Sequence, residues 1–376
     1  MSADAERLRD LTLELVEVES PTGDTAEVAR LYARRLEEIG MDVELLDDVF
    51  PATPTVVARL RGGPGPTVVL NGHLDTVPIP HEPPRVEGGA VYGRGSADMK
   101  GALAAAAEAV RVLKEAGPFA GEVAIVAIGL HEAPGGRGED LAHLLGERGF
   151  RADAAVVCEL SGHDIAVAHM GVATMEITVS RAGMPTHELQ TPKGTPHPLS
   201  AAARVIDSIR RRNEELSAVE HPWVGAETYF VGEVHGGDFY NRFPTTCRIV
   251  GTRRWAPGNM LEAVERELRA LLAGVAEETG CDIDLDLRLV RGAYEIDPEH
   301  ELVRALQGAY REVTGAKLEP VGIKVVADGA LFAAAGIPTV YHGPVGSGAH
   351  ADVEFVPVAE LVRAADVYAA LLRRLL

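Results

Sequence analysis

The chain has 376 residues, of which 46 % are apolar, and its 36 basic and 56 acidic residues give a net charge of −20. This length exceeds what one hydrophobic core usually supports, so two domains are expected. The acidic excess argues against nucleic acid and anionic membranes as partners. Three widely spaced cysteines and the lack of a long uninterrupted apolar run favour a reducing cytoplasm and no membrane span.

The first part of the chain alternates short apolar strands with helices, which is typical of a sheet covered on both faces. Residues 62–66, rich in glycine and proline, are predicted to form a hairpin turn before an apolar strand that ends at His73. The other expected elements are a helical pair over 5–40 with Gly40 as C-cap, strands at 42–46, 55–61, 122–129 and 154–157, and helices at 102–115 and 139–147.

From about residue 168 the pattern changes to alternation of apolar and polar residues, which predicts half-exposed antiparallel strands. After residue 294 the α/β pattern resumes. We therefore expect one domain from residues 1–167 and 291–376, with a mostly parallel core, and an inserted α+β domain of roughly ferredoxin-like order at 168–290. The expected later elements are strands at 173–180, 245–252, 282–289, 321–326 and 338–342, and helices at 198–216, 259–279, 300–314 and 357–375.

His73 and Asp75 lie at the end of the strand that begins near residue 68. Residues two apart in a strand share a face, so both side chains would leave the strand on the same side. This spacing suits a metal-bound imidazole with an orienting carboxylate, or a catalytic dyad. A solvated loop with two polar residues has the same local sequence.

Other histidines and acidic residues favour a metal site over a solvated loop, because they also follow predicted strands or lie in adjoining turns. Two imidazoles and three carboxylates would suit a pair of zinc ions, with one carboxylate bridging the ions and one position open for water. Cobalt or manganese could take the same ligands. The five candidate ligands are His73, Asp98, Glu132, Glu159 and His350.

The sequence resembles a family of zinc-dependent metallopeptidases and deacylases that includes acetylornithine deacetylase, succinyl-diaminopimelate desuccinylase, aminoacylase and carboxypeptidase G. The resemblance covers essentially the whole chain, the insert included, and its first two motifs are specific. The matching stretches are Gly72 to Pro78, Gly93 to Gly101, Gly183 to His187, Asn241 to Pro244, and Gly343-Pro344 with Ala349-His350 and Glu354.

The resemblance implies a role for each metal-site residue. His73 would bind one zinc ion, and Asp75 would orient the His73 imidazole. Asp98 would bridge both ions, and its peptide bond to Met99 would be cis. Glu159 would complete the first zinc site, and His350 the second.

The resemblance also implies that the insert is a lid and dimerisation domain, so that the protein is a homodimer. His187 resembles the lid histidine that reaches into the partner subunit's site and helps to hold the developing oxyanion. Asn241 and Arg254 resemble the side of the pocket that binds the substrate carboxylate.

One stretch departs from the family pattern, which carries Asp-Glu-Glu where this chain has Leu130-His131-Glu132-Ala133. Counting along the strand places His131 at the general base and Glu132 at the zinc ligand. Counting back from Gly135 and Gly136 places Glu132 at the base and Ala133 at the ligand. We prefer the first alignment, because a slip within a strand turns every side chain to the wrong face, whereas an extra loop residue costs little.

The sequence thus predicts a di-zinc amidohydrolase that cleaves an N-acyl amino acid or a small peptide through a metal-bound hydroxide. His131 or Glu132 would be the general base; a histidine is suitable because its ordinary pKa of about 6.5 is near working pH. The alternative is a non-catalytic or mono-metal member that binds an amino-acid derivative. An aminopeptidase of related fold is a third possibility.

Overall fold

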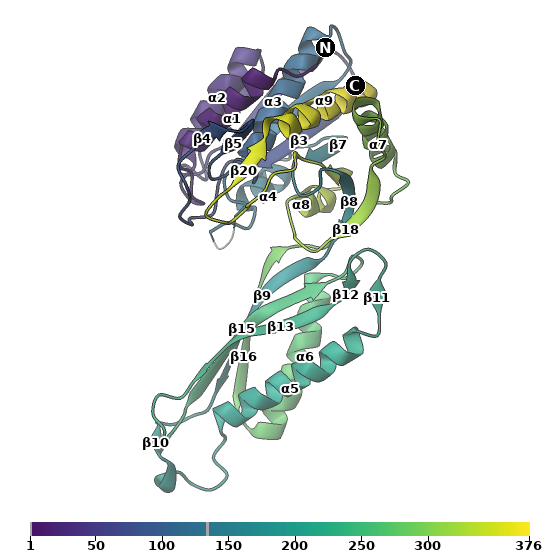
Figure 1. The fold of residues 1–376 in the computed structure, drawn as a ribbon. Helices are drawn as coiled ribbons and strands as arrows, with labels where there is room; N and C mark the ends of the chain where they lie inside the picture. The colour runs from purple at the N-terminus through teal and green to yellow at the C-terminus, as the bar shows by residue number, and fades with distance from the viewer. Residues whose placement is uncertain (1, 133–134) are drawn as a thin grey trace. The chain divides into compact units, whose positions relative to one another are not determined.

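The structure, a computed structural model, describes residues 2–132 and 135–376. The chain forms two compact units (Figure 1). The first unit comprises Met1–Val167, Ile296–Gly322 and Ala327–Leu376, and both chain ends lie in it. The second comprises Ala168–Glu295 and Ile323–Val326. Among the described residues, no helix combines the length and apolar character that crossing a bilayer requires.

A large mixed sheet organises the first unit, which confirms the α/β fold class predicted from the sequence. Its strand order is β1-β2-β6-β3-β7-β19-β8-β17, and β18 also pairs with β8. The central pairings of β3 with β6, β3 with β7 and β7 with β19 are parallel. The strands are β1 (Asp42–Leu46), β2 (Thr55–Arg61), β3 (Thr67–His73), β6 (Glu122–Ile128), β7 (Ala154–Val157), β8 (Asp164–His169), β17 (Tyr294–Glu295), β18 (Glu319–Ile323) and β19 (Thr339–Tyr341).

The hairpin predicted at residues 62–66 is wrong. Strands β2 and β3 run in opposite directions, but β6 lies between them, antiparallel to β2 and parallel to β3. The glycines and prolines of this segment indicate a chain reversal, which does occur. They carry no information about a third strand that inserts between the two.

Helices cover the large sheet, because its central strands are buried on successive residues and therefore on both faces. Helix α3 packs on β3 and β6 and contacts α1 and α9, while α8 contacts β7 and β19. Gly72 permits the close approach of α3, since a Cβ there would lie 2.6 Å from Met99 Cε. The helices are α1 (Ala5–Glu17), α2 (Ala26–Ile39), α3 (Lys100–Glu115), α4 (Glu139–Gly146), α7 (Glu301–Thr314), α8 (Gly329–Ala334) and α9 (Val358–Leu375); a small sheet contains β4 (Arg85–Glu87), β5 (Ala90–Tyr92) and β20 (Phe355–Pro357).

The second unit is a four-stranded antiparallel sheet, in the order β13-β15-β9-β16, with two helices packed against it. Along the chain its main elements run β-α-β-β-α-β, the split βαβ arrangement. Its core includes Met175, Ile177, Val205, Ile249 and Leu268. The elements are β9 (Gly171–Ser180), β10 (Thr186–His187), a 3₁₀ turn (Glu188–Gln190), α5 (Pro198–Leu216), β11 (Glu220–His221), β12 (Gly225–Ala226), β13 (Thr228–Gly236), β14 (Arg242–Phe243), β15 (Thr246–Trp255), α6 (Leu261–Thr279) and β16 (Asp282–Arg291).

Candidate metal centre

The carboxyl ends of three parallel strands bring the first site residues together. Strand β3 ends at His73, β6 leads into His131 and Glu132, and β7 leads into Glu159. Because β3 pairs in parallel with both β6 and β7, these ends meet at one edge of the sheet, where α/β folds place their sites. The parallel pairing therefore explains why residues so distant in sequence converge.

His73 is fully buried, and its two ring nitrogens face different groups. Nδ1 lies 2.9 Å from the backbone carbonyl oxygen of Asp75. A carbonyl only accepts, so Nδ1 carries the hydrogen and Nε2 faces the carboxylate of Asp98 at 3.2 Å. Burial opposes a charge on this imidazole, yet the Asp98 and Asp75 carboxylates raise the pKa of His73 well above its ordinary value. This arrangement, with one nitrogen fixed by the backbone, is typical of a metal-binding histidine.

The carboxylate of Asp75 makes contacts that the sequence did not predict. Its Oδ2 accepts hydrogen bonds from the backbone N–H of Glu132 at 2.8 Å, the N–H of His131 at 3.1 Å and the hydroxyl of Thr22 at 2.8 Å. Its Oδ1 lies 3.6 Å from His73 Nδ1. Asp75 therefore contacts His73 through its own backbone carbonyl and holds the turn after β6 through its side chain.

Asp98 lies between two imidazoles, as a bridging carboxylate should. Its Oδ1 is 3.2 Å from His73 Nε2, and its Oδ2 is 3.5 Å from His350 Nε2. Burial by itself would raise the pKa of Asp98, but hydrogen bonds from these two histidines hold it well below its usual range. The Asp98–Met99 peptide bond is cis, in agreement with the family resemblance.

Glu354 fixes the backbone that carries Asp98. Its Oε1 accepts hydrogen bonds from the N–H of Ala97 at 2.9 Å and of Asp98 at 3.0 Å. Its Oε2 pairs with the buried guanidinium of Arg94 at 2.7 Å. The candidate bridging residue thus lies on a turn that a buried ion pair holds in place.

Glu132 and His350 form the other side of the cluster. His350 Nε2 lies 3.1 Å from Glu132 Oε1. The Asp98 carboxylate, assisted by Glu132, raises the pKa of His350 to about 9. Glu132 therefore faces His350, and it also has a ligand atom within 4.8 Å of one of Asp98, the candidate bridging carboxylate. Ala133, the ligand in the second alignment, lies outside the described residues.

Glu159 is a buried carboxylate whose Oε1 has no hydrogen-bond partner among the described residues. Its Oε2 lies 3.9 Å from His73 Nε2. Burial raises the pKa of Glu159 to about 7. A buried carboxylate oxygen without a hydrogen-bond partner is costly unless a ligand satisfies it, so this atom is suited to bind a cation.

His131 is stacked on His73, with ring centroids 4.1 Å apart and planes within 2° of parallel. Its Nδ1 donates to Oδ2 of Asp328 at 2.7 Å. Burial lowers the pKa of His131, but the Asp328 carboxylate more than offsets this and raises it to about 9. Asp328 was missed by the sequence analysis, since it belongs to no motif that we recognised.

Ligand atoms of these residues gather closely enough to hold metal ions. His73, Asp98 and Glu132 have ligand atoms within 4.8 Å of one another, and so do His73, His131 and Glu159. Imidazoles and carboxylates are ligands that zinc accepts, as do cobalt and manganese. All five sequence-predicted ligands and His131 therefore lie in one cluster of the first unit.

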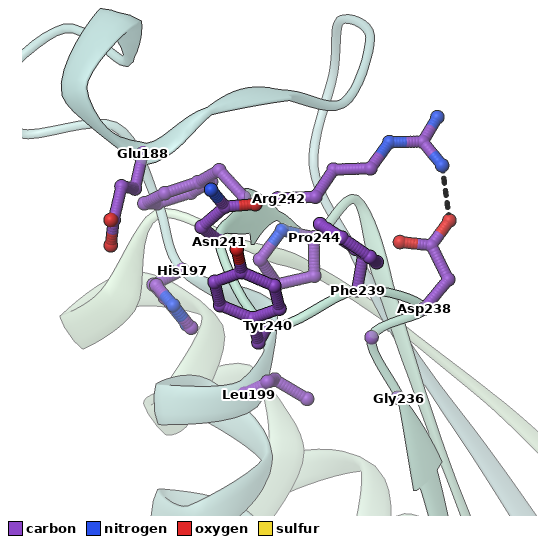
Figure 2. Close-up of a pocket in the computed structure, with 12 residues that line it drawn as sticks. Glu188, His197, Leu199, Gly236, Asp238, Phe239, Tyr240, Asn241, Arg242 and Pro244 are labelled. Atoms are coloured by element: carbon purple, nitrogen blue, oxygen red, sulfur yellow. Dashed lines mark hydrogen bonds and ion pairs between the residues drawn. The ribbon is translucent and has the colours of Figure 1, made fainter.

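Three predicted residues lie in the second unit. Strands β10 and β14 pair antiparallel, and the Asn241 side-chain amide lies 3.1 Å from His187 Nε2. Asn241 and Tyr240 line a cavity of about 710 Å³ (Figure 2). Arg254 does not line that cavity, because it lies eight residues along β15 from Thr246, roughly 26 Å away at the rise of a β-strand. Its guanidinium donates to the carbonyl of Lys324 at 3.1 Å.

Known proteins resemble the chain over most of its length. Residues 69–374 match the model of peptidase family M20/M25/M40. A succinyl-diaminopimelate desuccinylase of Alkalilimnicola ehrlichii is 30 % identical, with 98 % of each chain covered. An N-formyl-4-amino-5-aminomethyl-2-methylpyrimidine deformylase of Halalkalibacterium halodurans is 28 % identical, with 91 % of this chain and 87 % of that protein covered.

Two solved structures have the same fold. Aminopeptidase PepT from Bacillus cereus gives a TM-score of 0.84 at 22 % identity, with 99 % of both chains covered. The YXEP protein of Bacillus subtilis, described as a dinuclear metal binding peptidase, gives a TM-score of 0.73 at 17 % identity, with 98 % of both chains covered.

Proposed function

The chain belongs to peptidase family M20/M25/M40 and is a metal-dependent amidohydrolase. We propose that it binds two zinc ions and uses them to hydrolyse an N-acyl amino acid or a small peptide. The family predicted from the sequence motifs is confirmed. Desuccinylase and deformylase relatives support an acyl group on nitrogen as the substrate. The observation that carries the proposal is the convergence of all five predicted ligands in one cluster.

The residues present fit a pair of ions. His73, Asp98 and Glu159 would hold one ion, and Asp98, Glu132 and His350 the other. The buried Oε1 of Glu159 supports this assignment, because it has no hydrogen-bond partner among the described residues and a cation would satisfy it. Bound zinc would supply Lewis acidity and lower the pKa of a water molecule. Cobalt or manganese could replace zinc at these ligands.

We assign the general base to His131; the positive charge of bound zinc would lower its pKa from about 9 and favour the neutral imidazole, which can accept a proton. The 3.1 Å contact between Glu132 and His350 supports Glu132 as a ligand, which is the first of the two alignments. With Nδ1 bonded to Asp328, His131 would take a proton from water at Nε2 while the water oxygen attacks the amide carbonyl carbon. It would then give this proton to the leaving nitrogen as the carbon–nitrogen bond breaks.

The second unit would act as a lid and dimerisation domain. His187 and Asn241, already in contact with each other, would hold the developing oxyanion and the substrate. In this proposal they act on the partner subunit of a homodimer. Arg254 would pair with a substrate carboxylate. Asn241 precedes the start of β15 and Arg254 lies near its end, so the two would contact different parts of the substrate.

A substrate panel with metal analysis tests this function. We expect the zinc-loaded protein to cleave one or more N-acyl amino acids or dipeptides, and His131→Ala to lower kcat by about 10²–10⁴-fold. His163→Ala is the matched control, since His163 is a largely exposed histidine of the same unit. Tight binding without hydrolysis on every panel member would instead support a non-catalytic protein, and cleavage of unblocked peptides alone would indicate an aminopeptidase.

A further inference from the structure

Asp328 is a buried carboxylate that faces the proposed base. It is 1 % exposed, and its Oδ2 lies 2.7 Å from His131 Nδ1. The two residues are 197 positions apart, and Asp328 belongs to neither group of candidate metal ligands. Its placement immediately before α8 brings it to the site from a different part of the chain.

Helix capping does not explain the orientation of the Asp328 side chain. An aspartate just before a helix ordinarily accepts a hydrogen bond from a backbone N–H of the first turn. Asp328 holds this position for α8, yet its side chain makes no such capping bond within the described residues. The Asp328 carboxylate instead contacts Nδ1 of His131.

Two contacts together fix the His131 ring. Stacking on His73, with ring planes 2° from parallel, sets the plane of the ring. The bond to Asp328 sets the rotation within that plane, because it fixes where Nδ1 lies. With Nδ1 facing Asp328, Nε2 is the nitrogen that would exchange a proton with a reacting molecule.

We propose that Asp328 is a positioning residue, which holds His131 as the Nδ1–H tautomer with Nε2 turned toward the reacting water. This inference rests on the proposed function of His131 as general base. Nε2 accepts one proton from water and later delivers it to the leaving nitrogen, while the Nδ1–H stays bonded to Asp328, whose own protonation does not change. The chain would thus use an imidazole hydrogen-bonded to a carboxylate where the family pattern that it resembles carries a glutamate.

The pairing of Asp328 with His131 can be tested by measuring the effect of Asp328→Asn on kcat in two backgrounds, where we expect effects of opposite sign. In the wild-type background, Asp328→Asn should lower kcat by about 10²–10⁴-fold, with KM changing much less, because an asparagine can stabilise the wrong imidazole tautomer. In the His131→Glu background the base is a carboxylate, and Asp328 would repel it. There, Asp328→Asn should raise kcat by about tenfold or more, since two adjacent carboxylates cannot both ionise readily.

Asp140→Asn is the matched control, because Asp140 is also 1 % exposed but accepts its hydrogen bonds from the backbone N–H groups of Gly129 and Leu141. Asp140→Asn should lower the free energy of unfolding, and any change that it causes in kcat should have the same sign in both backgrounds. If Asp328→Asn lowers kcat by the same factor in both backgrounds, Asp328 has a structural role only and the proposal is overturned.

Two readouts do not depend on activity. Equilibrium dialysis should give the same zinc content for wild-type protein and Asp328→Asn; a lower content in the variant would make His131 a metal ligand and overturn the proposal. At about pH 10, where the His131 imidazole is neutral, nitrogen–proton NMR correlations should show its proton on Nδ1 in wild-type protein and on Nε2 in Asp328→Asn. If wild-type protein hydrolyses no substrate, the proposed function fails, and an unchanged tautomer in the variant would separately refute the positioning role.

Discussion

Replacement of Asp75 by asparagine tests whether this carboxylate holds the turn that carries Glu132 and His131. Asp75 Oδ2 accepts from Glu132 N at 2.8 Å, while the His131 N–H is shared between Oδ2 at 3.1 Å and Oδ1 at 3.2 Å. Asparagine offers one acceptor oxygen and directs its NH₂ group at a backbone N–H. Since a hydrogen bond to a charged group contributes about 1.5–3 kcal/mol, Asp75→Asn should lower the unfolding free energy of the metal-free protein by this amount.

The same variant should also bind zinc about 10–100-fold more weakly, because it loosens the support of a ligand. Urea unfolding and a competitive zinc titration measure the two effects. Asp153→Asn is the control: its carboxylate accepts from Thr67 N at the other end of β3, and it is exposed. This control should change zinc affinity by less than about twofold. If Asp75→Asn folds and also binds zinc like the wild-type protein, Asp75 does not position the turn.

The remaining predictions concern the buried charges around the site. Glu354→Gln leaves the buried Arg94 guanidinium without its carboxylate, so urea unfolding should show a loss of about 3–5 kcal/mol, and a loss below about 1 kcal/mol would contradict the role of this pair. Burial raises the pKa of Asp140 from 3.8 to about 7. The folded state therefore keeps a proton that the unfolded chain releases, and the unfolding free energy should fall as pH rises from about 4 to 7. Asp140→Asn should remove this part of the slope in unfolding curves measured across that range. Zinc binding at pH 7 should release protons from His73 and His350 into a weakly buffered solution, because both histidines must be neutral to bind metal; binding without proton release would contradict their assignment as ligands.

Several elements could be predicted because their patterns are local. Strands β1, β2 and β7 and helix α5 begin and end where the sequence placed them, and Gly40 does end α2 in a left-handed conformation. Strand β13 was not predicted, because most of its residues are exposed and it shows no clean alternation. Strand β8 was also missed: it is short, its apolar run is only four residues between Asp164 and His169, and it lies where the pattern changes.

In the candidate site, too, local patterns could be predicted and long-range contacts could not. The ligands could be named from the sequence because they belong to motifs and follow predicted strands. The roles of Asp328 and of the Asp75 side chain could not, because they depend on contacts between segments far apart in sequence and on backbone N–H groups that leave no trace in residue identity. The order of β2, β6 and β3 depends on long-range pairing for the same reason.

A zinc titration of the metal-free protein, with hydrolysis of the best panel substrate followed at each step, would show whether two zinc ions are needed for hydrolysis. We expect no hydrolysis without metal and a rate that rises until two zinc ions are bound per chain, with Glu132→Ala losing one of them. Full hydrolysis in the presence of a strong chelator, or a chain that binds no zinc at micromolar concentration, would contradict this expectation.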